Sequence, residues 1–335
     1  MKLAGWKMMA GSGFLAALMC LPVWGVDDSY QRRSAAPGTL NYVEGQASMA
    51  DQTLDNKSVG SATLQNGEIL KTGNGKAEIL LTPGVYLRLG GNSSVKMVSN
   101  SLINTQLAID HGEAMLEVDQ LYSQNNIHVT QPGADARVLK TGLYDFDANN
   151  GQVRVFDGKA VVNADDRNVT VKKGHELAVN SDKLKAVSFN KKDVTDKNDL
   201  YRWSSLRSQY LSEANVDTAR VYYANGWYGA GWWGPGWYWN PWFAGFTFVP
   251  GAGYFYNPFG WGFYSPLVVT RAPVVIARGP HHFDGTRPVA IGQGFRNHTV
   301  TSFRGSGMRG GMSGPRPTAP HASGFSGAHS GPVHR

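Results

Sequence analysis

Short alternations of apolar and polar residues, each interrupted by glycine, recur through residues 37–190 of the chain. Between Leu70 and Val95 the runs AEILL and VYLRL alternate in this way, and turns that contain glycine separate them. Alternation directs successive side chains to opposite faces of a strand, and glycine permits the positive φ of a tight turn. The pattern therefore predicts an all-β domain of many short, glycine-hinged strands over residues 37–190.

Two blocks of this region resemble the FecR family. The first is LKTGNGKAEILLTPGVYLRLGGNSSV, residues 70–95, and the second is ADARVLKTGLYDFDANNGQVRVFDGKAVV, residues 134–162, followed by KKGHELAV. The resemblance extends over about residues 40–180 and implies a FecR-like β-solenoid or otherwise β-rich fold.

In the regulator branch of that family, the resemblance implies a cytoplasmic segment that binds a sigma factor, one membrane-crossing helix and a periplasmic sensor. Only seven residues precede the apolar run that begins at Met8. We therefore expect a periplasmic FecR-like β-domain protein without the cytoplasmic anti-sigma segment.

One amphipathic helix is predicted over residues 193–216. Apolar residues recur there near helical spacing, at Leu200, Trp203, Leu206, Tyr210 and Leu211. The candidate N-caps are Thr195, Asp196 and Asn198, and Asn215 is the candidate stop signal. We expect the Leu/Trp face of this helix to pack on the β-domain or on the segment that follows.

An uncharged, aromatic and Gly-rich segment follows at residues 221–270, and residues 221–264 alone hold 20 of the chain's 38 aromatic residues. Glycine and proline interrupt it too often for a lipid-spanning helix, because each freed backbone group in hydrocarbon costs several kcal/mol. Aromatic runs punctuated by glycine instead predict short hairpins with stacked rings.

Two interpretations of these aromatic residues stay open. In the first, the rings pack on one another and on the helix as a small second core, since a soluble monomer rarely exposes so large an apolar patch. In the second, exposed Trp and Tyr faces contact sugar rings or a membrane surface. The candidate ligand-contact residues are Trp232, Trp233, Trp237, Trp239 and Trp242.

Residues 1–25 have the pattern of a secretory signal peptide, with two lysines, an apolar run over residues 8–21 and a cleavage site near Gly25. The run of about 14 residues is short for a spanning helix, which needs about 20, and an uncleaved anchor is the alternative. Cys20 is the only cysteine and lies in this run. The mature chain would then be a cysteine-free protein of the periplasm or cell envelope.

The net charge of +7 belongs to the C-terminal end of the chain. From Arg271 onward there are eight Arg, no Lys and one acidic residue, Asp284, so that 8 − 1 = +7. Residues 279–335 are predicted to be disordered, since they hold too few apolar residues to offset the entropy of ordering. Acidic envelope polymers or anionic lipid headgroups are possible partners for this positive charge. Export argues against nucleic acid as a partner. The remaining interpretation is a solvated tail without a binding role.

No local catalytic motif is found, whether G-x-S-x-G, P-loop or H-E-x-x-H. Asp145 and Asp147 would share one face of a strand, but we interpret them as a solvated strand edge rather than a pair of catalytic acids. The His281–His282 pair alone is weak evidence for a metal. The sequence therefore predicts no enzyme activity, no cofactor and no metal site.

The leading hypothesis is a non-enzymatic, exported FecR-domain protein of the bacterial cell envelope that acts by binding or assembly. Its partner would be an envelope protein or a polysaccharide. One alternative is a membrane-anchored FecR-type signalling regulator, which requires the apolar run to stay uncleaved. Another is an envelope carbohydrate-binding protein that uses the Trp/Tyr-rich segment.

Overall fold

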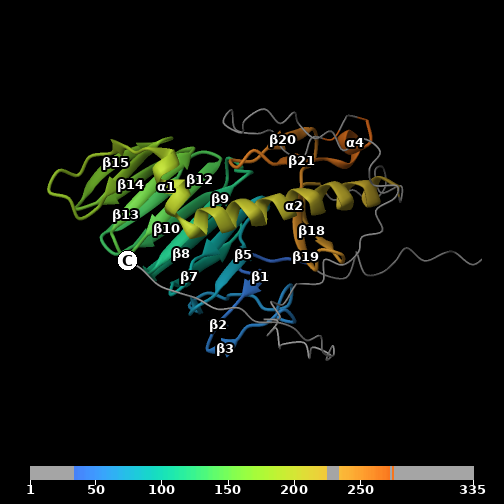
Figure 1. Ribbon diagram of the computed structural model, residues 1–335, viewed down its shortest axis with the longest axis horizontal. Coiled ribbons are helices and arrows are strands. Elements are labelled where there is room, and N and C mark those ends of the chain that lie inside the picture. The colour runs from blue at the N-terminus through green and yellow to red at the C-terminus, as the bar shows by residue number, and fades with distance from the viewer. Residues whose placement is uncertain (1–33, 225–233, 272–273, 275–335) are drawn as a thin grey trace, which may run out of the picture. The chain divides into compact units, whose positions relative to one another are not determined.

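The computed structural model describes residues 34–224, 234–271 and 274, all of which belong to one compact unit (Figure 1). Most of the regular structure is β-strand, which confirms the all-β class. The strands of the β-domain are β1 Leu40–Glu44, β2 Ala47–Met49, β3 Gln52–Thr53, β4 Ile69–Thr72, β5 Lys76–Leu80, β6 Val85–Leu89, β7 Ser94–Ser101, β8 Asn104–His111, β9 Glu113–Val118, β10 Asn126–Gln131, β11 Ala134–Val138, β12 Gly142–Asp147, β13 Gln152–Asp157, β14 Lys159–Ala164, β15 Arg167–Lys172, β16 His175–Ala178 and β17 Val187–Ser188.

These strands form two separate sheets. The first has eight strands in the order β1-β5-β6-β9-β12-β13-β16-β17, and the second has nine in the order β15-β14-β11-β10-β8-β7-β4-β2-β3. The chain passes back and forth between the two sheets, and nearly all neighbouring strands are antiparallel, with β8 and β10 parallel. Among the described residues the strands do not close into the coil that a solenoid would have.

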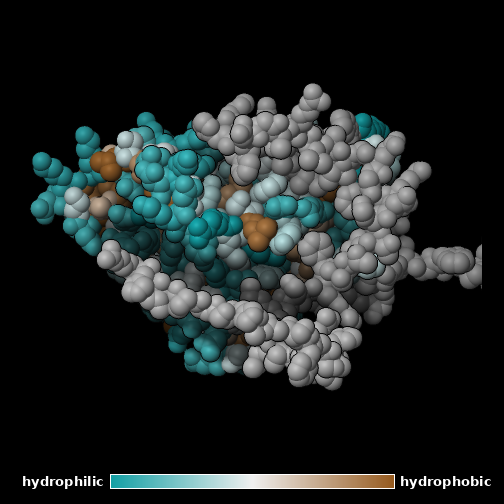
Figure 2. All heavy atoms as spheres, viewed as in Figure 1, coloured by the Kyte–Doolittle hydropathy of each residue, from teal (hydrophilic) through white to brown (hydrophobic). Residues whose placement is uncertain are grey.

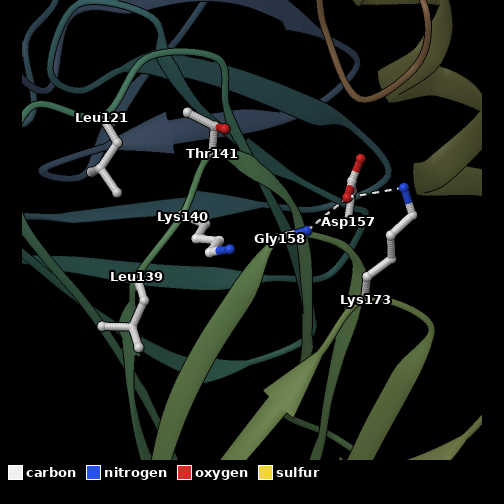
Figure 3. Close-up of a pocket in the computed structure, with 7 residues that line it drawn as sticks. All are labelled: Leu121, Leu139, Lys140, Thr141, Asp157, Gly158 and Lys173. Atoms are coloured by element: carbon white, nitrogen blue, oxygen red, sulfur yellow. Dashed lines mark hydrogen bonds and ion pairs between the residues drawn. The ribbon is translucent and has the colours of Figure 1, made fainter.

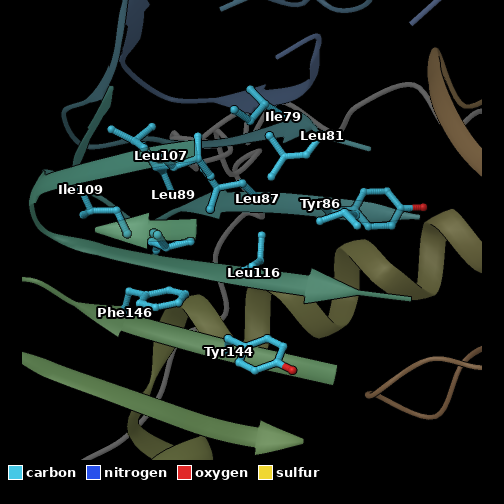
Figure 4. Close-up of a cluster of buried hydrophobic side chains, with 14 of the residues drawn as sticks. Ile79, Leu81, Tyr86, Leu87, Leu89, Leu107, Ile109, Leu116, Tyr144 and Phe146 are labelled. Atoms are coloured by element: carbon cyan, nitrogen blue, oxygen red, sulfur yellow. The ribbon is translucent and has the colours of Figure 1, made fainter. Parts of the chain in front are cut away.

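The main core lies against the inward face of the first sheet. A row of apolar side chains crosses six of its strands in register: Ala77, Leu89, Ala114, Phe146, Val153 and Leu177. These residues are fully buried and belong to one apolar cluster with Leu107 and Ile109 of β8 (Figure 4). Alternation along each strand thus places one face of the sheet in the core, as the sequence predicts.

Two helices follow where the sequence predicts one over residues 193–216. They are α1 Lys191–Lys197 and α2 Asp199–Ala224. Asn198 separates them because its backbone is extended, and its side chain accepts a hydrogen bond from the Tyr201 backbone N–H (2.6 Å), which caps α2.

Asn215 does not end α2, so its prediction as a stop signal is wrong. It is fully buried, and its amide group bonds three backbone groups of the segment beyond the helix. The helix continues to Ala224 because Val216, Ala219 and Tyr222 are buried on its final turns. The amide that suggested a helix end is a tertiary contact.

The aromatic segment forms two hairpins and a short helix. The hairpins pair β18 Gly236–Asn240 with β19 Gly245–Val249, and β20 Tyr254–Tyr256 with β21 Gly262–Tyr264; α4 is Pro266–Val269. Phe255 stacks on Phe263 with ring centroids 5.3 Å apart, in line with the prediction of hairpins with stacked rings. In Figure 1 both hairpins lie along α2, which contacts β18, β19 and β21.

No described helix is long and apolar enough to cross a membrane. The predicted signal peptide, residues 1–25, and the predicted disordered tail, residues 279–335, lie outside the described residues.

Candidate functional site

The outward face of the first sheet carries charged side chains in register, directly behind the apolar row. On each strand, the residue next to the apolar row belongs to a second row that faces the other way. In order across the sheet, its members are Glu78, Arg88, Met115, Asp145, Arg154 and Glu176. Because neighbouring residues of a strand point to opposite faces, this row faces away from the core. Four adjacent strands, β5, β6, β9 and β12, are buried on both faces.

The strongest charge pairs of this face are fully enclosed. Arg88 lies between two carboxylates: its Nε is 2.7 Å from Glu78, and its Nη1 bonds Glu117. All three side chains have no exposed surface. Buried charges require a partner and further hydrogen bonds, since desolvation costs several kcal/mol per ion.

α2 supplies partners for both carboxylates. Arg207 Nη2 lies 2.9 Å from Glu78 Oε1, and the Ser208 hydroxyl donates to Glu117 Oε2. Asn41 Nδ2 of β1 also donates to Glu78 Oε1 (2.9 Å). Asn257 Nδ2, in the β20–β21 loop, donates to Glu117 Oε1 (2.5 Å). All four carboxylate oxygens are thus bonded, and the bonds join the sheet, the helix and the second hairpin.

The pKa of Glu78 follows from this enclosure. Burial by itself raises the pKa, but the charges of Arg207 and Arg88 and their hydrogen bonds outweigh burial and lower it to about 2. The pKa of neighbouring Asp119 shifts in the opposite direction. Burial, followed by the charge of Glu117, raises it well above its usual value.

A second cluster lies further along the same row. Arg154 Nη1 is 2.9 Å from Asp145 and its Nε is 2.8 Å from Glu176. Burial, followed by the charge of Glu113, raises the pKa of Asp145 well above the usual range. Asp145 has no exposed surface, and β12 lies inside the sheet between β9 and β13, so its prediction as part of a solvated strand edge is wrong.

What this charged face can do follows from its burial. Paired carboxyl groups can transfer protons, but these are enclosed by the sheet and α2, so the arrangement joins segments of the chain. Within residues 34–224, 234–271 and 274, no group of three or more His, Cys, Asp or Glu side chains could hold a metal ion. The charged face is a contact between FecR-like strands and the segment that follows them.

The predicted ligand-contact tryptophans have different environments. Trp237 is half-buried and packs edge-on against Tyr86, with ring centroids 4.8 Å apart. Trp239 is buried against Phe246. Trp242 is 75% exposed in the turn between β18 and β19. Trp232 and Trp233 lie outside the described residues.

An open pocket of about 430 Å³ lies elsewhere, beside the start of β12 (Figure 3). Leu121 and Leu139 form its apolar wall, and Asp157 is ion-paired with Lys173 at 3.2 Å. Gly158, which also lines it, has φ +98°, and a Cβ there would lie 2.3 Å from the Tyr144 hydroxyl oxygen. The carboxylate of Asp157 is already paired, and the lysines that line the pocket are exposed. The pocket is therefore a weaker candidate for a functional site than the charged face.

Sequence reasoning missed Glu78, Arg88, Glu117 and Arg207. The signal that could have found the first three is the regular occurrence of a charged residue between core positions in AEILL, YLRLG and GEAMLEV. Arg207 carries no such signal, because its partner is 129 residues away in the chain.

The comparison with protein families agrees with the β-domain. Residues 68–161 match the model of the FecR protein family, which confirms the resemblance for that part of the chain. A search of the curated proteins found no match. Two crystal structures of a putative anti-sigma factor from Parabacteroides distasonis align with 41% of this chain, at 16% and 15% identity and a TM-score of 0.33. The alignments cover 62% and 63% of those chains, less than two thirds of their length.

Proposed function

We propose that this chain is an exported, non-enzymatic FecR-domain protein of the bacterial cell envelope that acts by binding or assembly. The observation that carries the proposal is the closure of the charged face of the sheet by α2 and the second hairpin. Glu78 and Glu117 are neutralised within the chain, so this face is not offered to a partner. The β-domain then serves as a rigid support for the helix and the aromatic hairpins.

Export and envelope localisation are supported by the first 25 residues. Their two lysines, apolar run and small residue at Gly25 form the pattern of a cleaved signal. A chain without cysteine after that point depends on its core rather than on disulfides, which suits the large apolar cluster between the sheets.

The test of export is the intact mass of the full chain recovered from the periplasmic and membrane fractions of a bacterial host. We expect a periplasmic species that begins near Val26. A membrane-bound species that retains residues 1–25 would contradict this proposal and favour the membrane-anchored regulator.

The test of binding is sedimentation of the purified chain with isolated cell envelopes. We expect the chain to pellet with the envelopes and to release no soluble sugar or peptide from them. A chain that stays in the supernatant would overturn the binding role, and steady release of fragments would overturn the non-enzymatic one.

A further inference from the structure

Three aromatic side chains and two cationic ones lie in a row along one side of α2. Trp203 of α2 lies beside Tyr42 of β1, with ring centroids 6.1 Å apart. The guanidinium group of Arg207 lies 4.0 Å from the Tyr42 ring centroid and 4.9 Å from that of Phe243. Trp242 immediately precedes Phe243 in the turn between β18 and β19.

The row is held in a fixed geometry by the charged face beneath it. The salt bridge to Glu78 fixes the guanidinium group of Arg207 between its two rings. Asn41, next to Tyr42, bonds both the N–H (2.7 Å) and the carbonyl (3.0 Å) of Phe246 and so ties the first hairpin to β1. A ligand would therefore meet rings that lose little conformational entropy on binding.

The exposed part of the row is apolar but small. Trp242 is 75% exposed, whereas Trp203, Tyr42 and Phe243 are half-buried. Leu206, the neighbour of Arg207 on α2, is 46% exposed. Hydrophilic residues predominate over the described part of the surface in Figure 2, with apolar patches that are small and separate.

The charges of the row are neutralised within the chain. Arg207 is paired with Glu78. Lys76, whose Nζ is 6.0 Å from the Trp203 ring centroid, lies 2.9 Å from Asp199 and 3.7 Å from Glu44. A ligand for this surface therefore needs flat apolar faces and hydrogen-bonding groups rather than net charge.

We infer that this row is a binding surface for a neutral polysaccharide. The C–H faces of sugar rings would pack on Trp242 and on the exposed parts of Tyr42 and Trp203. Their hydroxyl groups would bond the polar groups at the end of the row, Lys76 and Asp199. The inference rests on the proposed binding function and names its ligand class.

Two other occupants fit the row less well. A membrane surface would need a broad apolar face flanked by unpaired cations, whereas the carboxylates of Asp199 and Glu44 stand beside Lys76. A stable protein interface takes about 20–30 residues from each partner, many more than the row provides.

The test is the affinity of the full chain for a panel of soluble neutral hexasaccharides: β-1,4-glucan, β-1,3-glucan, α-1,4-glucan and chitin fragments. Polygalacturonate serves as the charged comparison. Binding is measured by isothermal titration calorimetry for the wild type, Trp242→Ala and Trp203→Ala. The matched control is Tyr254→Ala, which removes an aromatic ring that is 57% exposed on the second hairpin.

We expect at least one neutral oligosaccharide to bind, Trp242→Ala to weaken it about tenfold or more, and Tyr254→Ala to leave it unchanged. Because Trp203 is half-buried, the fold of Trp203→Ala is checked by circular dichroism before its affinity is compared. The inference is overturned if no neutral oligosaccharide binds, if the polyanion binds more tightly than all of them, or if the Trp242 and Tyr254 variants lose affinity equally. Envelope sedimentation that persists in Trp242→Ala would overturn this surface while leaving the proposed envelope binding intact.

Discussion

Replacement of Glu78 by Gln tests whether the buried charge cluster fixes α2 to the sheet. Gln keeps the size of the side chain but removes its charge. Arg88 then retains Glu117 as partner, while Arg207 loses its carboxylate. The positive charge of Arg207 is then left without a carboxylate partner, although its side chain is only 5% exposed.

The expected loss of stability can be worked out in two ways. Breaking one partner of a buried salt bridge costs about 3–5 kcal/mol. Linkage gives a similar value: the pKa of Glu78 falls from 4.5 to about 2 on folding, and this difference is worth about 3.5 kcal/mol. We therefore expect Glu78→Gln to lower the free energy of unfolding by about 3 kcal/mol at neutral pH.

The same pKa shift fixes the pH dependence. A carboxyl group whose pKa is lowered on folding stabilises the protein above its unfolded pKa, here 4.5, and this contribution is lost as the pH falls towards 2. The wild type should therefore lose stability across that window. Glu78→Gln should lose less, because it has no proton to bind at this site.

The assay is urea unfolding followed by tryptophan fluorescence, at neutral pH and at steps through the acid window. Asp51→Asn is the matched control, since it breaks an exposed pair with Lys71 (3.5 Å; side chains 91% and 52% exposed) and should cost less than about 1 kcal/mol. A loss no larger for Glu78→Gln than for Asp51→Asn would show that the buried charge cluster does not fix α2 to the sheet.

Three further variants test other parts of the structure, each by urea unfolding. Asp119→Asn should be more stable than the wild type at alkaline pH and should lose that advantage as the pH falls towards 3.8. The reason is that an acid whose pKa is raised on folding destabilises the protein as the pH rises above the pKa of the unfolded chain. Equal changes of stability with pH in Asp119→Asn and the wild type would contradict this. Asn215→Ala should cost at least about 1–3 kcal/mol, because it leaves buried backbone groups of both hairpins without partners; an unchanged midpoint would show that the hairpins do not depend on this amide. Gly158→Ala should lower the free energy of unfolding by about 1–3 kcal/mol, which is more than the loss expected for Gly67→Ala. Both glycines have a positive φ, but only at Gly158 would a Cβ clash with the Tyr144 hydroxyl. Equal losses in the two variants would show that this clash does not matter.

The sequence predicts the β-domain well because its strands follow a local rule. Alternation around glycine locates the strands on either side of Gly84, and the same pattern identifies the FecR-like blocks. The local rule cannot tell which strands are buried on both faces, because that depends on a segment more than one hundred residues away. Glu78, whose partner Arg207 is 129 residues away, is buried for this reason.

The candidate site is harder to predict because its contacts are made by residues with two local interpretations. Asn198 is a good N-cap, and the sequence suggests it as one; Asn215 has the same chemistry but bonds the hairpins from within the helix. Among the tryptophans, composition cannot distinguish the buried Trp239 from the exposed Trp242, since only hairpin register and packing decide between them.

The closure of the charged face by α2 is tested most directly by a double-mutant cycle between Glu78 and Arg207, whose side chains meet across 129 residues of sequence. The free energies of unfolding of Glu78→Gln, Arg207→Gln and the double variant are compared with that of the wild type. We expect the double variant to be less destabilised than the sum of the single variants, with a coupling energy of about 1–3 kcal/mol. Additivity within about 0.5 kcal/mol would contradict the contact between helix and sheet on which the account depends.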